Sequence, residues 1–598
     1  MTGIQVRRGR AAVVALAAGA LVLSACSSGG GGNGKGKEQG PKAKEQGLIE
    51  FADAEASSGA AEDVPGAKPG GTIRILQRDS FAHTDPAQIY VSDEGMLATL
   101  IHRRLTTVKL DNDGKYTVVG DLATDSGKPS DGGKTWTYKL KDGIKFEDGS
   151  PITSKDIRHT FERQFAPFIT EGPTFVQSWL ANTAGTEYRK LLPDGPYKGK
   201  HLPDSILETP DDKTVVFKFK KAQNDLPYAV GMAGYGVVSQ AKDTKEKYDK
   251  KPVASGPYKI QDFKSGKSMT LVKNTEWDPK TDSARHQYPE KFEITFNHQS
   301  DDYAKRVMSD TGENQYAAAF TNFVDAGSMP KVMGDKEIKS RSMSGYQSYV
   351  AQFAMNMDRI KDKKVREAIT HALPIKSVLA PYGGTTGGDL AASLISPLLP
   401  GHDAKYDPYG KLKKPNGDPE KAKALLKEAG KEGMKLTYAY NNSAEDQQVS
   451  VAVADALKQA GFNVQRKELP ADTYYDLVGK RDNKYDLYRN NWGHDWPSSS
   501  TVIPPLFDGR KIADGANNYS HVNDPKINSE IDRILKIADP AEAATEWWEL
   551  NKYILEEVLP VVPAYYYKQT QVTGSKIGGA IYNDDLNGTD PTKLYVKQ

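Results

Sequence analysis

The sequence predicts an α/β protein with more than one domain. Its 598 residues are several times the roughly 150 residues of an average domain. In the later half, a helix over 418–430 and a second helix ending near Gly461 alternate with strands such as "FNVQRKEL". The earlier half is richer in hairpin patterns. Alternating helices and strands favour an α/β lobe, and the change of pattern indicates a separate, hairpin-rich part.

Composition restricts the classes of function. The chain is 38% hydrophobic and 26% charged, which is typical of a globular protein and leaves no room for many membrane spans. The formal charge is +2, and Arg7, Arg8 and Arg10 lie in an N-terminal segment that carries no acid. Without that segment no basic surplus is left, so we expect no nucleic-acid partner.

The first 25 residues have the pattern of a signal peptide. Basic "RRGR" precedes the apolar stretch "AAVVALAAGALVL", and small residues follow it. The apolar stretch is too short for a membrane-spanning helix with ordinary flanks. We therefore predict a cleaved signal peptide over residues 1–25.

The stretch "LSAC" places Cys26, the only cysteine of the chain, where cleavage makes it the first residue. It resembles the bacterial lipobox, which implies thioether lipidation of Cys26 and a diacylglycerol anchor. The alternative is a soluble secreted protein with a chance cysteine, although a lone thiol has little other use in an oxidising compartment. Lipidation implies the outer face of a Gram-positive cytoplasmic membrane, or the periplasm in a Gram-negative cell.

A segment of low complexity follows the cysteine. It begins "SSGGGGNGKGKEQGPKAKEQG" and continues with small and acidic residues as far as Pro69. Such a composition cannot bury a core. We expect residues 26–68 to form a flexible linker with an end-to-end distance on the order of 35 Å, and the folded part to begin with a strand over 70–76.

Residues 135–165 show a compact sequence of elements. Trp136, Tyr138 and Leu140 alternate as in a strand, and "KDG" and "EDGSP" are turn signals. A helix follows, with Thr153 or Ser154 as its N-cap and Asp156 in its first turn. Its apolar side chains have helical spacing, so we expect them to pack in the core.

Several stretches together resemble a known family. "LKDGIKFEDGSPITSKDIRHTFER" is similar to the signature of extracellular solute-binding protein family 5, which includes the oligopeptide and dipeptide binders of ABC importers. The resemblance covers roughly residues 70–598. Further matches occur in the family's order: "DPAQI" (85–89), "PVASGPYKIQDFKSGKSMTLVKN" (252–274), "FAMNMDRIKDKKVREAITHAL" (353–373), "DPEKAKALLKEAG" (418–430) and "LPVVPAYYY" (559–567).

This resemblance implies a type II (class C) periplasmic-binding-protein-like fold. Two lobes enclose the ligand, and an extra domain is inserted in the first lobe. Crossings near residues 333 and 553 would form a hinge. Matching positions give lobe I as 69–104, 205–333 and 554–598, the inserted domain as 105–204, and lobe II as 334–553.

The stretch "NNWGHDWPSSS" (490–500) places Asp495 between Trp492 and Trp496. An acid beside aromatic faces suits a cation, because the carboxylate supplies charge and the rings add quadrupole attraction. In the family's peptide binders an acid in the matching stretch takes the α-amino group of the ligand, so the resemblance implies this role for Asp495. The alternative is a loop acid or N-cap that binds backbone amides.

Four neighbours of Asp495 are further candidates for the ligand site. The resemblance implies that Arg489 meets a ligand carboxylate, and a solvated strand-edge arginine is the alternative. Trp492 and Trp496 are either ligand contacts or core. Gly493 leaves room for a ligand main chain beside the strand.

His494 and the facing lobe complete the candidate site. His494 is a cleft residue, a pH-sensitive contact or a solvated loop residue. On the facing lobe, the resemblance implies that Tyr90, Val91 and Ser92 contact the ligand main chain. The sequence departs there from the residues usual in peptide binders, so ligand length and chemistry stay open. The same family includes binders of nickel complexes, sugars and antibiotic precursors.

Motifs for catalysis are missing from the sequence. It has no nucleophile elbow, no phosphate loop and no HExxH. The ten histidines are scattered without a close pair, so we expect neither a metal site nor a cofactor. These observations predict a binding protein rather than an enzyme.

The sequence thus predicts a lipid-anchored monomer that captures a small peptide between two lobes and presents it to the permease and ATPase subunits of an ABC transporter. Two alternatives are left open. The ligand is a sugar, a siderophore or a metal complex, or the protein is a lipoprotein sensor that passes on a peptide signal without import.

Overall fold

The computed structural model describes residues 47–183 and 185–598. The predicted signal peptide (1–25) and the predicted lipidation site Cys26 lie outside the described residues. Within the described part, no helix combines the length and the apolar character that crossing a membrane requires.

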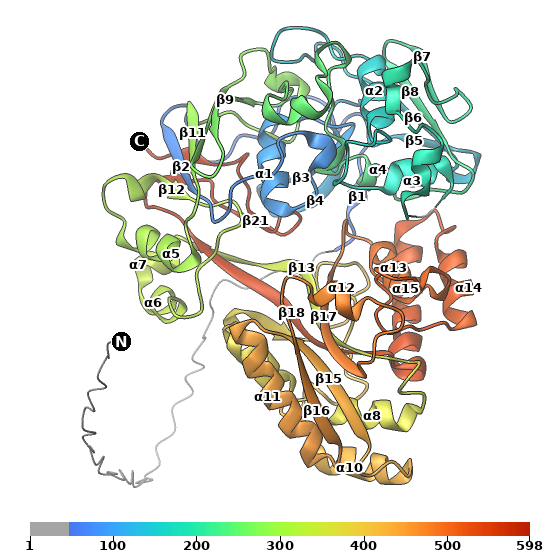
Figure 1. The fold of residues 1–598 in the computed structure, drawn as a ribbon. Coiled ribbons are helices and arrows are strands. Elements are labelled where there is room, and N and C mark those ends of the chain that lie inside the picture. Colours follow the sequence, from blue (N-terminus) through green and yellow to red (C-terminus); the bar gives the residue numbers. More distant parts are fainter. Residues whose placement is uncertain (1–46, 184) are drawn as a thin grey trace, which may run out of the picture. The chain divides into compact units, whose positions relative to one another are not determined.

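The first lobe is drawn mainly in blue, cyan and green in Figure 1. Its five-stranded sheet has the order β12-β2-β11-β10-β9, its four-stranded sheet β5-β6-β8-β7, and its three-stranded sheet β1-β4-β3. The strands are β1 (Glu50–Phe51), β2 (Thr72–Leu76), β3 (Thr106–Leu110), β4 (Tyr116–Gly120), β5 (Lys128–Ser130), β6 (Thr135–Lys139), β7 (Leu207–Asp211), β8 (Thr214–Lys218), β9 (Tyr258–Lys264), β10 (Ser268–Lys273), β11 (Lys291–Thr295) and β12 (Ala317–Ala318).

Helices and two short C-terminal hairpin-like pairs complete this lobe. α1 packs on the five-stranded sheet, because Leu97 and Ile101 share one apolar core with Ile73 and Phe292. The helices are α1 (Ser92–Ile101), α2 (Ser154–Arg163), α3 (Phe175–Ala181), α4 (Leu226–Ala229), α5 (Ser300–Ser309), α6 (Met329–Gly334) and α7 (Lys336–Ser340). The short strands are β19 (Ile577–Gly578), β20 (Tyr582–Asn583), β21 (Gly588–Thr589) and β22 (Tyr595–Val596), paired β19-β22 and β20-β21.

The second lobe is built on a six-stranded sheet with the order β14-β18-β13-β17-β15-β16. β15 pairs in parallel with both β16 and β17, as expected where helices connect strands. The strands are β13 (Ser342–Met355), β14 (Gly388–Leu390), β15 (Lys435–Asn441), β16 (Asn463–Leu469), β17 (Leu487–Gly493) and β18 (Val561–Val572). The helices are α8 (Lys363–Ala372), α9 (Ile375–Leu379), α10 (Pro419–Glu428), α11 (Ala444–Gln459), α12 (Tyr474–Val478), α13 (Ile503–Phe507), α14 (Pro525–Ile534) and α15 (Pro540–Tyr553).

The local signals read from the sequence correspond to observed elements. α2 begins with a capping box between Thr153 and Asp156, and its apolar residue Phe161 is buried. α10 begins with Asp418 as N-cap and Pro419 in the first turn. These helix starts follow from side-chain chemistry alone, because each cap accepts backbone N–H groups that the helix leaves unpaired.

The two long strands β13 and β18 connect the lobes (Figure 1). They pair antiparallel from Ser342 opposite Val572 to Ala354 opposite Val561. Val572 packs in a first-lobe core with residues of α5, whereas Val561 packs in the second-lobe core. The predicted crossings near 333 and 553 are therefore wrong in position: the chain changes lobe within these strands, since residues 554–558 still bury side chains in the second lobe.

The expected end of the inserted domain at residue 204 is also too early. β8 pairs with β6, and Phe217 on β8 lies in the same apolar core as Trp136 on β6. The four-stranded sheet cannot be divided between two domains, so the inserted part extends at least to Lys218.

Residues 47–68 are not a flexible linker, which corrects the prediction for this segment. β1 pairs in parallel with β4, and Ile49 is 1% exposed within the core that also contains Tyr228. The Nζ of Lys141 donates to the carbonyl oxygen of Ser57 at 2.7 Å. A few apolar side chains and backbone hydrogen bonds fix a segment whose composition is otherwise typical of disorder.

Candidate ligand-binding site

The loop after β17 positions Asp495. β17 pairs with β13, with Trp492 opposite Val350, and the loop follows where β17 ends at Gly493. Trp492 Nε1 donates to the carbonyl oxygen of Thr501 at 2.8 Å. The backbone N–H of Asp495 donates to Thr501 Oγ1 at 3.2 Å. The loop is thus tied at both ends, and the carboxylate of Asp495 is left for other partners.

Among the described residues, the Asp495 carboxylate accepts one hydrogen bond, and its donor is on the first lobe. The hydroxyl of Tyr90 donates to Asp495 Oδ1 at 2.5 Å. Burial raises the pKa of Asp495 to about 6, although this hydrogen bond acts to lower it. Among the described residues, no basic side chain lies within 4.0 Å of the Asp495 carboxylate. A desolvated acid without a cation is a suitable site for an ammonium group.

A cavity of about 660 Å³ surrounds this pair. Its walls come from both lobes and are rich in tyrosine, including Tyr228 of the first lobe and Tyr349 of the second. The volume is within the range of small-molecule sites. Eight of the predicted residues line it: Tyr90, Val91, Ser92, Trp492, Gly493, His494, Asp495 and Trp496.

Trp496 contacts the first lobe. Its ring lies 4.8 Å from that of Phe175 and 6.1 Å from that of Trp179, and its side chain is 4% exposed. Nearby, Ser500 Oγ donates to Asp225 Oδ2 at 2.5 Å across the same boundary. Trp496 is therefore core between the lobes as well as cavity wall, whereas Trp492 is only partly buried against the second-lobe core.

Gly493 and His494 differ from expectation in detail. A Cβ at Gly493 would lie 2.9 Å from Ser348 Oγ and 3.0 Å from the Tyr349 ring, so side chains of β13 already occupy the space beside it. His494 lines the cavity, and its Nδ1 has no hydrogen-bond partner among the described atoms. Burial lowers the pKa of His494 to about 4, so it is neutral near pH 7 and does not act as a switch there.

Arg489 does not line the cavity, which contradicts its predicted contact with a ligand. Its side chain is 8% exposed, and its Nη2 lies 2.6 Å from Asp446 Oδ1. It also donates to the hydroxyls of Tyr565 and Tyr567 at 3.1 and 3.2 Å. Because Tyr567 is a cavity wall, Arg489 supports the wall from behind instead of facing the ligand.

Comparison with known proteins gives the family. Residues 117–514 match the model described as "Bacterial extracellular solute-binding proteins, family 5 Middle". The chain belongs to this family. The resemblance found in the sequence motifs is thereby confirmed.

Relatives of this family 5 protein cover most of its length. The probable D,D-dipeptide-binding periplasmic protein DdpA of Escherichia coli is 23% identical over 522 residues, which is 84% of this chain and 90% of that protein. The periplasmic murein peptide-binding protein MppA of Escherichia coli is 24% identical over 551 residues, or 88% and 95%.

Solved structures confirm the predicted fold class. The protein described as "Clavulanic acid biosynthesis oligopeptide binding protein 2" superposes with a TM-score of 0.80 at 27% identity and covers 91% of this chain and 100% of its own. DppA of Helicobacter pylori in complex with the peptide STSA gives a TM-score of 0.65 at 17% identity, with 89% and 99% covered. The two-lobed α/β periplasmic-binding fold is thus the fold of this family 5 protein.

Sequence reasoning missed two charged residues of the cavity. Arg104, between α1 and β3, and Asp585, in the turn between β20 and β21, both line it. Neither has a motif signal, because "HRRL" and "NDDLNG" are ordinary as sequence. Only the fold brings the C-terminal turn to the cavity wall.

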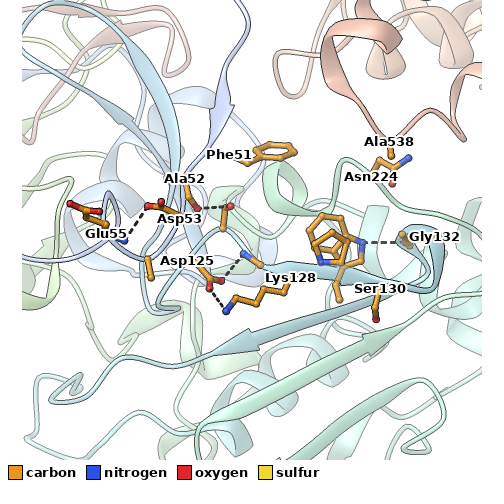
Figure 2. A pocket seen from close by; sticks show the side chains of 16 residues that line it. Phe51, Ala52, Asp53, Glu55, Asp125, Lys128, Ser130, Gly132, Asn224 and Ala538 are labelled. Carbon is orange, nitrogen blue, oxygen red and sulfur yellow. Dashed lines mark hydrogen bonds and ion pairs between the residues drawn. The ribbon is translucent and has the colours of Figure 1, made fainter.

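A second cavity, of about 760 Å³, lies beside the N-terminal segment of this family 5 protein (Figure 2). Two of its three carboxylates are held by backbone amides: Asp53 Oδ1 accepts the N–H of Glu55 at 3.1 Å, and Asp125 Oδ1 accepts the N–H of Gly127 at 3.0 Å. Lys128 lies 3.7 Å from Asp125. The cavity with Asp495 is the better ligand site, because residues of both lobes line it and its three charged side chains have no opposite charge within 4.0 Å among the described residues. Over the described residues, no group of three or more metal-ligating side chains is assembled.

Proposed function

We propose that this chain is the substrate-binding protein of an ABC importer, that it captures short peptides with a free amino terminus, and that a lipid on Cys26 holds it at the outer face of the membrane. The relatives named as dipeptide-, murein peptide- and oligopeptide-binding proteins support the peptide class. The unpaired carboxylate of Asp495 carries the proposal at the level of residues.

Asp495 provides the contact for the amino terminus. A buried carboxylate without a cation costs free energy, and an ammonium group that pairs with it recovers this cost. The tyrosine and tryptophan side chains of the wall supply aromatic rings, which attract the same cation. A ligand whose amino group is blocked loses this pairing.

Lobe closure provides selectivity. The Tyr90–Asp495 hydrogen bond and the Trp496 contact with Phe175 both join the lobes. A peptide that fills the cavity touches both lobes only when they are closed, so its affinity includes the free-energy difference between the open and closed states. The closed form is the one we expect a permease with its ATPase subunits to accept.

We infer a monomeric binding protein without catalytic activity. Mass spectrometry of the N-terminal peptide tests the anchor, since lipidation adds a diacylglycerol mass to Cys26. Cys26→Ala is expected to release the protein from the cell surface.

Isothermal titration calorimetry tests peptide binding. We expect di- to hexapeptides to bind and their N-acetylated forms to bind far more weakly. Asp495→Asn is expected to weaken binding by about 2–4 kcal/mol, the range for one lost partner of a buried charge pair. Asp142→Asn, at a fully exposed side chain, is the matched control and is expected to leave affinity unchanged. Equal affinity for the free and the acetylated peptides would show that Asp495 does not bind the amino terminus. Absence of binding to every peptide would show that the ligand is another solute.

A further inference from the structure

Three charged side chains line the cavity, and none has an opposite charge within 4.0 Å among the described residues. Asp495 belongs to the second lobe, and Arg104 and Asp585 belong to the first. Two acids and one base leave the wall with a surplus of one negative charge. Buried charges without partners are costly, so a ligand that supplies the missing charges gains affinity and specificity.

Arg104 is a buried guanidinium without a carboxylate partner. It is 6% exposed, and its Nη1 donates to the carbonyl oxygen of Gly231 at 2.8 Å. Its Nη2 donates to Thr99 Oγ1 at 3.2 Å, and its Nε has no partner among the described atoms. Burial lowers the pKa of Arg104 to about 10, so it is still charged at neutral pH. Because both acceptors are neutral, no anion among the described residues compensates the charge of Arg104.

Asp585 is a second acid without a partner. Its own N–H donates to Asn583 Oδ1 at 3.1 Å, which fixes the turn, but its carboxylate accepts no hydrogen bond from any described residue. Burial raises the pKa of Asp585 to about 6 against the attraction of Arg104. Arg104 and Asp585 line the same cavity, and no hydrogen bond or ion pair within 4.0 Å joins them among the described residues.

We propose that the cavity selects short peptides whose last residue is basic, with the amino terminus at Asp495, the terminal carboxylate at Arg104 and the basic side chain at Asp585. The proposal rests on the proposed function, because it assigns the remaining charges of the same cavity. A peptide of this kind carries two positive charges and one negative charge, the complement of the wall. The terminal carboxylate and the last side chain are adjacent in the ligand, and Arg104 and Asp585 both belong to the first-lobe wall of the cavity.

A charge series on the wild-type protein tests this first. The probes are Ala-Lys, Ala-Ala-Lys and Ala-Ala-Ala-Lys, with counterparts that end in methionine or glutamate, measured by calorimetry. At the length that binds most tightly, we expect the lysine peptide to bind about ten-fold or more tightly than the methionine peptide, and the glutamate peptide to bind most weakly. We expect the carboxyl-terminal amide of the lysine peptide to lose about ten-fold in affinity.

Variants assign the effect to residues. Asp585→Asn is expected to bring lysine and methionine peptides within about two-fold of each other, with the methionine peptide unchanged. Arg104→Met is expected to abolish the difference between free acid and amide. Circular dichroism shows whether each variant is folded. If Arg104→Met does not fold, the wild-type comparison of the free acid with the amide tests the carboxylate contact.

Two outcomes separate this inference from the proposed function. If lysine and methionine peptides bind the wild-type protein equally while N-acetylation abolishes both, the assignment of Asp585 is wrong and peptide capture stands. If no peptide binds, both proposals are wrong.

Discussion

Arg103 and Arg104 are neighbours in the sequence, and both are more than nine-tenths buried, yet their surroundings are opposite. Arg103 Nε donates to Asp121 Oδ1 at 2.7 Å, and Arg285 Nη2 holds the other oxygen of that carboxylate at 2.8 Å. Within the described part of the chain, the Arg104 side chain donates to neutral acceptors only, and it lines the cavity. Two arginines that are buried to a similar extent thus differ in pairing: Arg103 is paired with a carboxylate and Arg104 is not.

The difference separates charges that stabilise the lobe, such as Arg103, from charges that are available to a ligand, such as Arg104. A buried charge network that is fully paired holds the first lobe together and tolerates no missing partner. Unpaired charges lower the stability of the unliganded protein and are retained where binding repays the cost. Three predictions test this contrast.

The largest effect is expected in the paired network. Asp121→Asn leaves Arg103 and Arg285 buried with one anion fewer. We expect the free energy of unfolding to fall by about 3–5 kcal/mol, the cost of breaking a buried ion pair from one side. Urea unfolding followed by circular dichroism measures it. A loss below about 1 kcal/mol would mean that Asp282, which lies 3.0 Å from Arg285, suffices as counter-ion.

A smaller loss of stability is expected when the N-terminal segment, residues 47–68, is removed from this network. Lys141 donates to the carbonyl oxygens of Ser57 and Thr281, and so joins the N-terminal segment to the residues around Arg103. A protein that begins at residue 69 is expected to be less stable than one that begins at residue 47 by about 2–4 kcal/mol, from the lost burial of Ile49 and lost hydrogen bonds. Equal melting temperatures would show that the segment adds nothing to the fold.

The smallest effect is a gain in stability when the charge of Asp495 is removed from the cavity. The pKa of Asp495 is raised from 3.8 to about 6, so the folded state binds its proton more tightly than the unfolded chain does, and stability is lost as pH rises through about 6. Asp495→Asn removes this loss, and Asn can still accept the hydrogen bond of Tyr90. We expect unliganded Asp495→Asn to be more stable than wild type by about 1–2 kcal/mol at pH 8, with the difference vanishing near pH 4.

Thermal unfolding of both proteins at the two pH values measures this difference. The other ionisable groups lining the cavity, Arg104, Asp585, His494 and several tyrosines, are the same in both proteins. A variant that is less stable than wild type at pH 8 would mean that the carboxylate already has a stabilising partner.

Local chemistry made much of the fold predictable. The caps at Thr153 and Asp418 act within a few residues, so the sequence alone shows where α2 and α10 begin. Residues 47–68 were mispredicted because their composition is typical of disorder, while their order depends on pairing with β4 and on the burial of Ile49. These contacts depend on residues far away in the sequence, so the composition of the segment alone does not predict them.

The site was predictable only in part for the same reason. Asp495 lies in a recognisable stretch, and the cavity forms around it. The resemblance assigned Arg489 on β17 to the ligand, and the sequence alone does not show that its partner Asp446, on α11, lies beside it. Asp585 gave no signal, since a turn with two aspartates is common on any surface.

The loop over 494–501 carries both the acid that faces the cavity and two contacts that join the lobes, Trp496 with Phe175 and Ser500 with Asp225. Selectivity and the timing of release therefore share one short stretch of chain. If Asp495 holds the ligand as proposed, a substitution in this stretch that changes which ligand is accepted is expected also to change how long the protein keeps it. We therefore expect ligand range and dissociation rate to change together among variants of this loop.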